Sequence, residues 1–239
     1  MKIVSTGSTL FSSEQYEKKL KAKRRRLIIT SIIIVAILVG AVFVSRLRAL
    51  RIHEVNVVGA SVVSPEKIKE VVKDVISGYY LWLIPRDNAL LYPRSSIKEF
   101  LTRKFPRLNS IDLSVEGLER LNITVTEREP FALYCASALA PEDAHSCYFL
   151  DQSGFIFDQA PAFSGTVYFI YALEEPYLEP QGKQYLSIEE FKPLSTFINN
   201  LPALGLEPLA LELGDKETNL VLAHGARIVW KRGDDLSHL

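Results

Sequence analysis

Residues 18–48 read KKLKAKRRRLIITSIIIVAILVGAVFVSRLR and decide how the rest of the chain is arranged. Within them, residues 27–45 carry no charge, and 13 of these positions are Leu, Ile, Val or Phe. At ~1.5 Å per residue the run is just long enough to cross the ~30 Å hydrocarbon core of a membrane. Lipid offers no partners to backbone N–H and C=O groups, so the run can cross only as a helix.

Two other interpretations of the run fit its residues less well. A buried core helix would be shorter and would carry a polar face, which this run lacks. A cleaved signal peptide would have a shorter apolar region and a small-x-small cleavage site, and the Ser-Arg-Leu-Arg that follows Val44 is a poor cleavage context. We therefore expect a retained transmembrane helix at 27–45.

The flanking charges predict the orientation of this helix. Seven Lys and Arg residues lie in 18–26, and three lie in 46–51. This bias favours a cytoplasmic N-terminus, which makes 1–26 a cytoplasmic tail and 46–51 a linker. The nearly 190 residues that follow are then expected outside the cytoplasmic membrane, in a single-pass protein.

The formal net charge of zero is unevenly distributed. Residues 1–26 carry a net charge of +6, and the part after the apolar run carries −6. A basic tail beside a membrane is typical of contact with a lipid surface, so we expect the bilayer as a partner. The acidic outer part argues against nucleic-acid binding. We expect no small-molecule substrate.

Cys135 and Cys147 both fall in the outer part. In an oxidising compartment an even number of cysteines favours one disulfide, which would be worth ~3 kcal/mol in the chain-entropy description. The alternative is two free thiols.

Residues 52–128 predict a small α+β module. IHEVNVVGA (52–60) alternates as a half-buried strand and stops at Gly59. SPEKIKEVVKDVISG (64–78) has apolar residues at helical spacing, and SIKEFLTRKF (96–105) follows with a capping box formed by Ser96 and Glu99. IDLSVEGLERLNITVTER (111–128) gives two alternating strands joined at Gly117. Helices on one face of a small sheet bury both apolar faces.

The loop YYLWLIPRDNALLYP (79–93) is unusually apolar. We expect its aromatic residues to pack into the core beside the first helix of the module. The alternative is contact with lipid or with a partner.

After Glu129-Pro130 the pattern changes to a mostly antiparallel β domain with one helix, over 129–239. Its helical segment, SIEEFKPLSTFINNL (187–201), has a capping box at Ser187 and Glu190, yet a proline inside a helix costs about 3 kcal/mol. The helix therefore begins either at Ser187 or near Pro193. The strands are expected in FALYC, CYFLDQSGFIFDQA, TVYFIYA, LALEL, NLVLAH and ARIVWKR.

Two stretches and one glycine carry a resemblance to a known family. LNITVTEREP (121–130) lies at the joint between the module and the β domain, YFLDQSGFIF (148–157) reads as a strand, an Asp-x-x-Gly turn and a second strand, and Gly59 ends the first module strand. In this order behind one membrane span, they resemble the FtsQ/DivIB family of bacterial cell-division proteins, and the module resembles a polypeptide-transport-associated (POTRA) domain.

The residues of these motifs have mainly structural explanations. Asp151 and Gly154 are turn-forming residues, and Pro130 ends a strand because it lacks the N–H that a sheet requires. Glu127 and Arg128 are expected on a solvated or ion-paired face at the joint. None of them requires catalysis.

The resemblance implies a scaffold at the division septum. Its partners would be FtsB- and FtsL-like single-span proteins and, through them, the septal peptidoglycan synthase. Family members bind by adding a partner strand to a sheet edge. In the family this edge belongs to a last strand, which comes after a helix that follows the segment matching ARIVWKRGDDLSHL. The sequence stops at Leu239, before that strand. The domain is therefore expected to be truncated at its C-terminus. Lys192 falls where a basic, partner-facing residue would lie.

Enzymatic alternatives find little support in the residues. A cysteine hydrolase or sortase-like transpeptidase would use Cys135 or Cys147 as nucleophile, His145 or His224 as base and Arg227 at the oxyanion, but the sortase Cys-x-x-x-Arg pattern is missing. A POTRA-bearing secretion factor would add a large β-barrel. We expect no catalytic residues, no metal and no cofactor.

Overall fold

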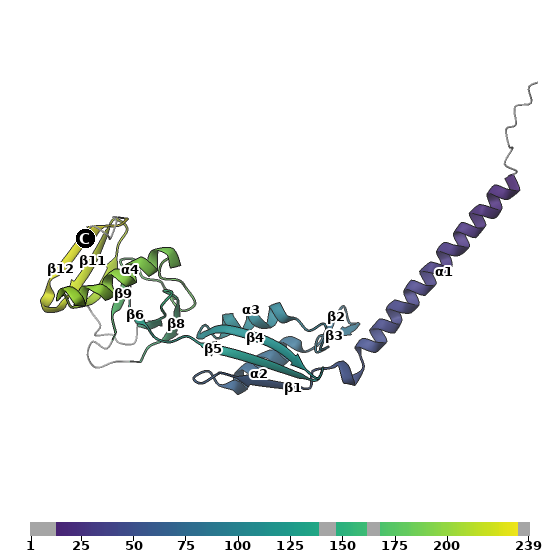
Figure 1. Cartoon of the computed structure of the whole chain (residues 1–239), viewed down its shortest axis with the longest axis horizontal. Coiled ribbons are helices and arrows are strands. Elements are labelled where there is room, and N and C mark those ends of the chain that lie inside the picture. Colours follow the sequence, from purple (N-terminus) through teal and green to yellow (C-terminus); the bar gives the residue numbers. More distant parts are fainter. Residues whose placement is uncertain (1–12, 139–146, 162–167, 234–239) are drawn as a thin grey trace, which may run out of the picture.

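The computed structural model describes residues 13–138, 147–161 and 168–233. They form three parts in a row, namely a long N-terminal helix, an α+β module and a β-rich domain (Figure 1). The mixed α+β fold class is thus as predicted.

Helix α1 (Ser13–Ser45) is longer than the predicted span because it begins within the basic tail. Its segment Lys18–Ser45 is long and apolar enough to cross a membrane, and the most apolar part has no contact that buries it within the protein. Large apolar side chains such as Ile37, Val39 and Phe43 are exposed along it. The predicted N-terminal helix of membrane-spanning length and composition is therefore confirmed.

The module contains the predicted order of elements and one extra hairpin. Its elements are β1 (Glu54–Val58), α2 (Pro65–Ile76), β2 (Tyr79–Tyr80), β3 (Ile84–Pro85), α3 (Arg94–Lys104), β4 (Leu108–Glu116) and β5 (Arg120–Glu127). In the main sheet β5 is central, parallel to β1 and antiparallel to β4. The two helices pack on one face of it, and the core includes Ile68, Val72, Ile97, Leu101, Leu121 and Ile123.

The capping box predicted at Ser96 and Glu99 is wrong. Helix α3 begins at Arg94, three residues before the Ile97 that a Ser96 cap implies, and no side chain caps it. The Arg94 guanidinium fixes this start, because it donates to the Leu113 carbonyl over 2.6 Å and to the Tyr92 hydroxyl over 2.7 Å. Glu99 instead pairs with Arg103 one turn later, at 2.6 Å.

The expectation that the aromatic residues of the apolar loop pack into the core is wrong for two of the four. Tyr92 is buried, but Tyr79 is half exposed and Trp82 is almost fully exposed. The β2–β3 hairpin turns the segment between its strands away from the module core. Hydropathy alone could not reveal this, since it does not show which way a hairpin points.

The predicted linker is held against the module. It forms a short 3-10 helix, η1 (Arg48–Leu50), and Leu50 accepts a backbone hydrogen bond from Ala89 at 2.9 Å. Arg51 pairs with Asp87 at 2.6 Å. Helix α1 therefore joins the module through a fixed segment.

The β-rich domain is built on one mixed sheet, with the strand order β12-β11-β10-β9-β6-β7-β8. Its strands are β6 (Ala132–Tyr134), β7 (Tyr148–Leu150), β8 (Ile156–Gln159), β9 (Ile170–Leu173), β10 (Pro208–Leu213), β11 (Glu217–Leu222) and β12 (Arg227–Lys231). Four pairings are antiparallel, as predicted for most of the domain. Strand β9 is parallel to both neighbours, because α4 supplies the crossover to β10 that parallel strands require.

Helix α4 (Ile188–Asn200) begins directly after Ser187, and the capping box with Glu190 is present. Pro193 lies inside the helix, so the start at Ser187 is the correct alternative. Phe191 and Leu194 bury this helix on one face of the sheet, and this packing outweighs the helix-breaking tendency of the proline. A short 3-10 helix, η3 (Leu201–Leu204), follows.

Cys135 and Cys147 are joined by a disulfide on the other face of the same sheet. Alternation along β6 explains the two faces, since Ala132 and Tyr134 point toward α4 whereas Leu133 and the following Cys135 point away. The structure thus contains the bridge and not the two free thiols.

Candidate functional site at the joint between the domains

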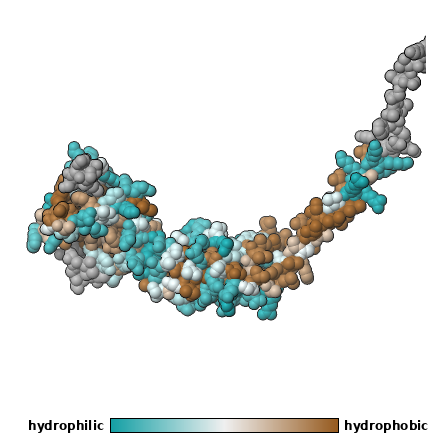
Figure 2. All heavy atoms as spheres, viewed as in Figure 1, coloured by the Kyte–Doolittle hydropathy of each residue, from teal (hydrophilic) through white to brown (hydrophobic). Residues whose placement is uncertain are grey.

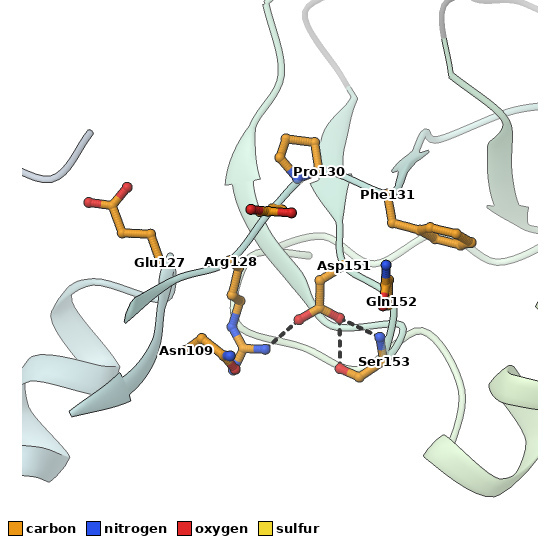
Figure 3. A pocket seen from close by; sticks show the side chains of 9 residues that line it. Asn109, Glu127, Arg128, Pro130, Phe131, Asp151, Gln152 and Ser153 are labelled. Atoms are coloured by element: carbon orange, nitrogen blue, oxygen red, sulfur yellow. Dashed lines mark hydrogen bonds and ion pairs between the residues drawn. The ribbon is translucent and has the colours of Figure 1, made fainter. Parts of the chain in front are cut away.

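The motif residues of the sequence meet where the module joins the β-rich domain. The end of β5 and the turn between β7 and β8 enclose a hollow of about 380 Å³ (Figure 3). It is lined by Asn109, Glu127, Arg128, Glu129, Pro130, Phe131, Asp151, Gln152 and Ser153. Residues from two motifs more than 20 positions apart thus form one site.

Arg128 and Asp151 form the central ion pair of this joint. Only 15% of the arginine side chain and 11% of the aspartate side chain are exposed. Arg128 also donates to the Pro106 carbonyl at 3.2 Å and lies 4.2 Å over the Phe155 ring. Truncating one partner of a buried pair leaves an uncompensated charge, which costs about 3–5 kcal/mol.

Asp151 uses its two carboxylate oxygens for different tasks. One oxygen accepts from the Ser153 N–H at 2.8 Å, the Ser153 hydroxyl at 2.6 Å and the Phe155 N–H at 3.1 Å, which closes the turn. The other oxygen binds Arg128. The sequence predicted the turn-forming role, but the contact with the other domain depends on tertiary structure.

A second arginine, which the sequence did not single out, crosses the same joint. Arg107 lies between α3 and β4 and donates to Asp158 of β8 at 2.8 Å. Its guanidinium carbon lies 5.4 Å from the centre of the Phe157 ring. The only local signal was a proline before it, which marks a turn and says nothing about a distant carboxylate.

Glu127 points away from the Arg128–Asp151 pair, into the module (Figure 3). Neighbouring residues at the end of a strand project to opposite sides, so Glu127 and Arg128 serve different domains. The Glu127 carboxylate accepts from the backbone N–H groups of Ser61, Val62 and Val63 at 2.8–3.1 Å. It therefore fixes the loop between β1 and α2. Of the two predicted alternatives, a solvated or an ion-paired face, the structure has the ion-paired one, since Arg128 pairs with Asp151 and Glu127 with Arg107.

These hydrogen bonds decide the ionisation of Glu127. Burial of the carboxylate acts to raise its pKa, but the backbone N–H groups of Val63, Ser61 and Val62 stabilise the charged form. The net result is that the pKa of Glu127 is lowered from its ordinary value. Arg107 adds a cation 3.5 Å from the same carboxylate.

The two motif glycines are required by close packing as well as by turn geometry. Gly59 has φ of +91°, and a Cβ placed there would lie 2.1 Å from the Val125 carbonyl oxygen. Gly154 has φ of +82°, and a Cβ there would lie 2.8 Å from the Phe191 ring. Gly59 thus lets β1 approach β5, and Gly154 lets α4 cover the β7–β8 turn.

The residues considered for catalysis do not come together at the joint. The disulfide leaves neither Cys135 nor Cys147 as a thiol. His224 and Arg227 are exposed near the start of β12, and His145 lies outside the described residues. Within the described ranges, no three His, Cys, Asp or Glu side chains are placed to hold a metal ion. The joint offers ion pairs and packing, which hold two domains together.

Strand β12 provides a second candidate surface, because it lies at the end of the seven-stranded sheet. Its ladder to β11 is flanked by hydrogen bonds from Leu222 N to Ala226 O and from Arg232 N to Lys216 O, both 2.8 Å. Antiparallel pairs alternate, so Ile228 and Trp230 direct their backbone groups to β11. The backbone groups of Arg227, Val229 and Lys231 then point to the outer edge.

In the part of the chain that the structure describes, no strand pairs with this outer edge of β12. Phe197 of α4 packs against Trp230, with 6.1 Å between ring centres, so α4 lies over the same strand. Lys192 is exposed one to two turns earlier on α4. No protein-family model matches the chain, and a search of curated proteins found no match.

Proposed function

We propose that this chain is a membrane-anchored, non-enzymatic scaffold of the bacterial division machinery, of the FtsQ/DivIB type. In this proposal α1 spans the cytoplasmic membrane with its N-terminus inside, the module is a POTRA-type domain, and the outer domains act at the septum. The partners are FtsB- and FtsL-like single-span proteins, which link the chain to septal peptidoglycan synthesis. The resemblance of the motif residues supports the family, and the basic residues before the span support the orientation.

The observation that carries the binding part of the proposal is the outer edge of β12, which in this proposal takes the place of the family's last strand, expected beyond ARIVWKRGDDLSHL. A partner segment in extended conformation adds there as an eighth strand, and backbone groups supply its affinity. Val229 lies at the centre of this edge, with its backbone directed outward and half of its side chain exposed. Arg227 and Lys231 flank it and are exposed, so a partner strand with acidic residues at the matching positions fits best.

The joint supports the same role by holding the acceptor sheet at a defined orientation. The pairs Arg128–Asp151 and Arg107–Asp158 both connect the module to the β7–β8 hairpin. A partner that itself spans the membrane meets β12 only at one height above the bilayer. A rigid connection between module and sheet fixes that height.

Proline at position 229 tests the edge. Val229→Pro removes the one outward N–H of that residue and leaves the ladder to β11 intact, since Val229 does not donate to β11. Val229→Ala is the matched control, because it trims the side chain and keeps the N–H. The two variants and the native chain are purified from membranes of a host that contains this division system, and co-purified proteins are identified by mass spectrometry.

We expect the native chain and Val229→Ala to recover single-span division proteins and Val229→Pro to lose them. A fluorescent fusion of the native chain is expected to form a mid-cell band in dividing cells. Equal recovery by Val229→Pro and Val229→Ala would exclude this edge as the binding surface. Uniform envelope labelling by the native fusion would exclude the division role.

A further inference from the structure

Three apolar side chains project from the turn between β2 and β3. Leu81 is 88% exposed and Trp82 is 89% exposed, and Leu83 is half exposed. Leu90 and Leu91, on the next turn of the same loop, are also exposed. Single exposed apolar residues are common, but five of them on two successive turns of one loop form a candidate interaction surface. We call Leu81, Trp82, Leu83, Leu90 and Leu91 the apolar tip.

The backbone conformation of the turn between β2 and β3 disfavours the residues that occupy it. Leu83 N donates to Tyr80 O at 3.0 Å, and the two central residues, Leu81 and Trp82, have φ of +45° and +66°. Positive φ at both central positions defines the turn type that favours Asn and Gly. Leucine and tryptophan are strained there, and such strain concentrates at functional positions.

Specific hydrogen bonds tie the tip to the end of α1. Arg46, the first residue after the helix, donates to the carbonyl of Leu83 at 3.0 Å and to that of Trp82 at 3.2 Å. Asn88, which is buried, donates to the Ser45 carbonyl at 3.0 Å and accepts from Leu90 N at 3.0 Å. Both turns of the tip are therefore fixed beside the last residue of the helix.

This position sets the height of the tip relative to a membrane. The apolar run 27–45 is about as long as the hydrocarbon core is thick, so Arg46 lies at the boundary between acyl chains and headgroups. The tip is within reach of the Arg46 side chain and lies at that boundary too. Figure 2 shows that hydrophobic residues continue from α1 onto the adjoining end of the module.

The composition of the tip suits this boundary better than water. Tryptophan is enriched at membrane interfaces, where its ring is half solvated, and leucine side chains enter the adjacent acyl region. Two arginines lie beside strand β2, which leads into the tip. Arg46 lies 5.9 Å from the Tyr79 ring centre and Arg86 lies 5.3 Å from that of Tyr80, and both are exposed. Arginines at this level are placed to meet lipid phosphates.

We propose that the apolar tip inserts into the outer leaflet of the membrane that α1 spans, as a second, interfacial anchor. The inference rests on the membrane-anchored part of the proposed function and is independent of the division role. Two attachment points fix the module against rotation and tilt about the end of α1.

The two tryptophans of the chain provide the test and its control. The full-length protein is reconstituted into phosphatidylcholine–phosphatidylglycerol vesicles, with and without bromine on the acyl chains, and tryptophan quenching is measured. Trp82→Phe leaves only Trp230, which is 7% exposed in the distant domain, and Trp230→Phe leaves only Trp82. Because the Trp82 side chain is almost fully exposed and the Arg46 bond goes to its backbone carbonyl, Trp82→Phe does not threaten folding. Carbonate washing of the same vesicles reports whether α1 is inserted.

We expect brominated lipid to quench the native protein and Trp230→Phe, and the quenching to be lost in Trp82→Phe. Trp82 is also expected to be shielded from aqueous acrylamide. One outcome would overturn insertion of the tip and leave the membrane anchor α1 in place. In it, the protein resists carbonate, brominated lipid does not quench Trp82, and acrylamide does. Shielding from acrylamide without lipid quenching would assign the tip to a protein contact and would likewise overturn insertion of the tip. Release of the protein by carbonate would overturn the anchor itself.

Discussion

Replacing Gly59 with alanine isolates the effect of a close contact between two strands. Gly59 follows β1, and the added Cβ would lie 2.1 Å from the Val125 carbonyl oxygen in the backbone of β5. Gly78, after α2 in the same module, is a matched control. Its φ of +86° is close to the +91° of Gly59, but a Cβ there meets nothing within 4 Å.

The expected magnitudes follow from this difference. Alanine at positive φ costs about 1–2 kcal/mol at either position. At position 59 the Val125 carbonyl must also retreat by almost 1 Å, although β5 is hydrogen-bonded to β1 on one side and β4 on the other. Such overpacking of a fixed group adds about 1–3 kcal/mol or more. Gly59→Ala should therefore destabilise the module by ~2–5 kcal/mol, and Gly78→Ala by ~1–2 kcal/mol.

Urea unfolding of the full-length chain in detergent, followed by far-ultraviolet circular dichroism, measures both variants. In a Trp82→Phe background, tryptophan fluorescence follows the β-rich domain separately, because Trp230 is then the one remaining tryptophan and is buried there. We expect Gly59→Ala to shift the module transition by at least ~1 kcal/mol more than Gly78→Ala, with the Trp230 transition nearly unchanged. Equal destabilisation by the two variants would refute the argument from close contact.

Three further predictions concern charged and covalent links. Glu127→Gln should lower the free energy of unfolding by about 1–3 kcal/mol, because three backbone N–H groups lose a charged acceptor. Since the pKa of Glu127 is lowered in the folded state, its contribution is complete above the ordinary value of 4.5 and is lost as pH falls through the folded pKa. Acid unfolding should thus be shallower in Glu127→Gln and unchanged in the exposed control Glu129→Gln. Asp151→Asn should keep the turn but lose the ion pair with Arg128, and Asp151→Ala should lose both. Asp151→Ala is therefore expected to melt at the lower temperature, and equal melting of the two variants would contradict the dual role. Replacing Cys135 and Cys147 together with serine should lower the melting temperature and retain the fold, at a cost of ~3 kcal/mol, and an unchanged melting temperature would argue against a stabilising bridge.

The elements that the sequence predicted are those set by local patterns. The apolar run of α1, the alternation in β5 and the capping box at Ser187 each depend on residues within a few positions of one another. The turn at Asp151 and Gly154 belongs to the same class. In each case the physical cause is short-ranged, since periodicity, capping and positive φ involve neighbouring residues.

The features that only tertiary structure decided are contacts between residues distant in sequence. The sequence placed Arg128 at the joint and Asp151 in a turn, but it did not show that they bind each other or that Arg107 reaches Asp158. Hydropathy placed the apolar loop in the core, whereas the β2–β3 turn exposes Trp82 at the end of α1. A sequence pattern states what a side chain prefers to contact, and the fold determines which distant group, or which solvent, it meets.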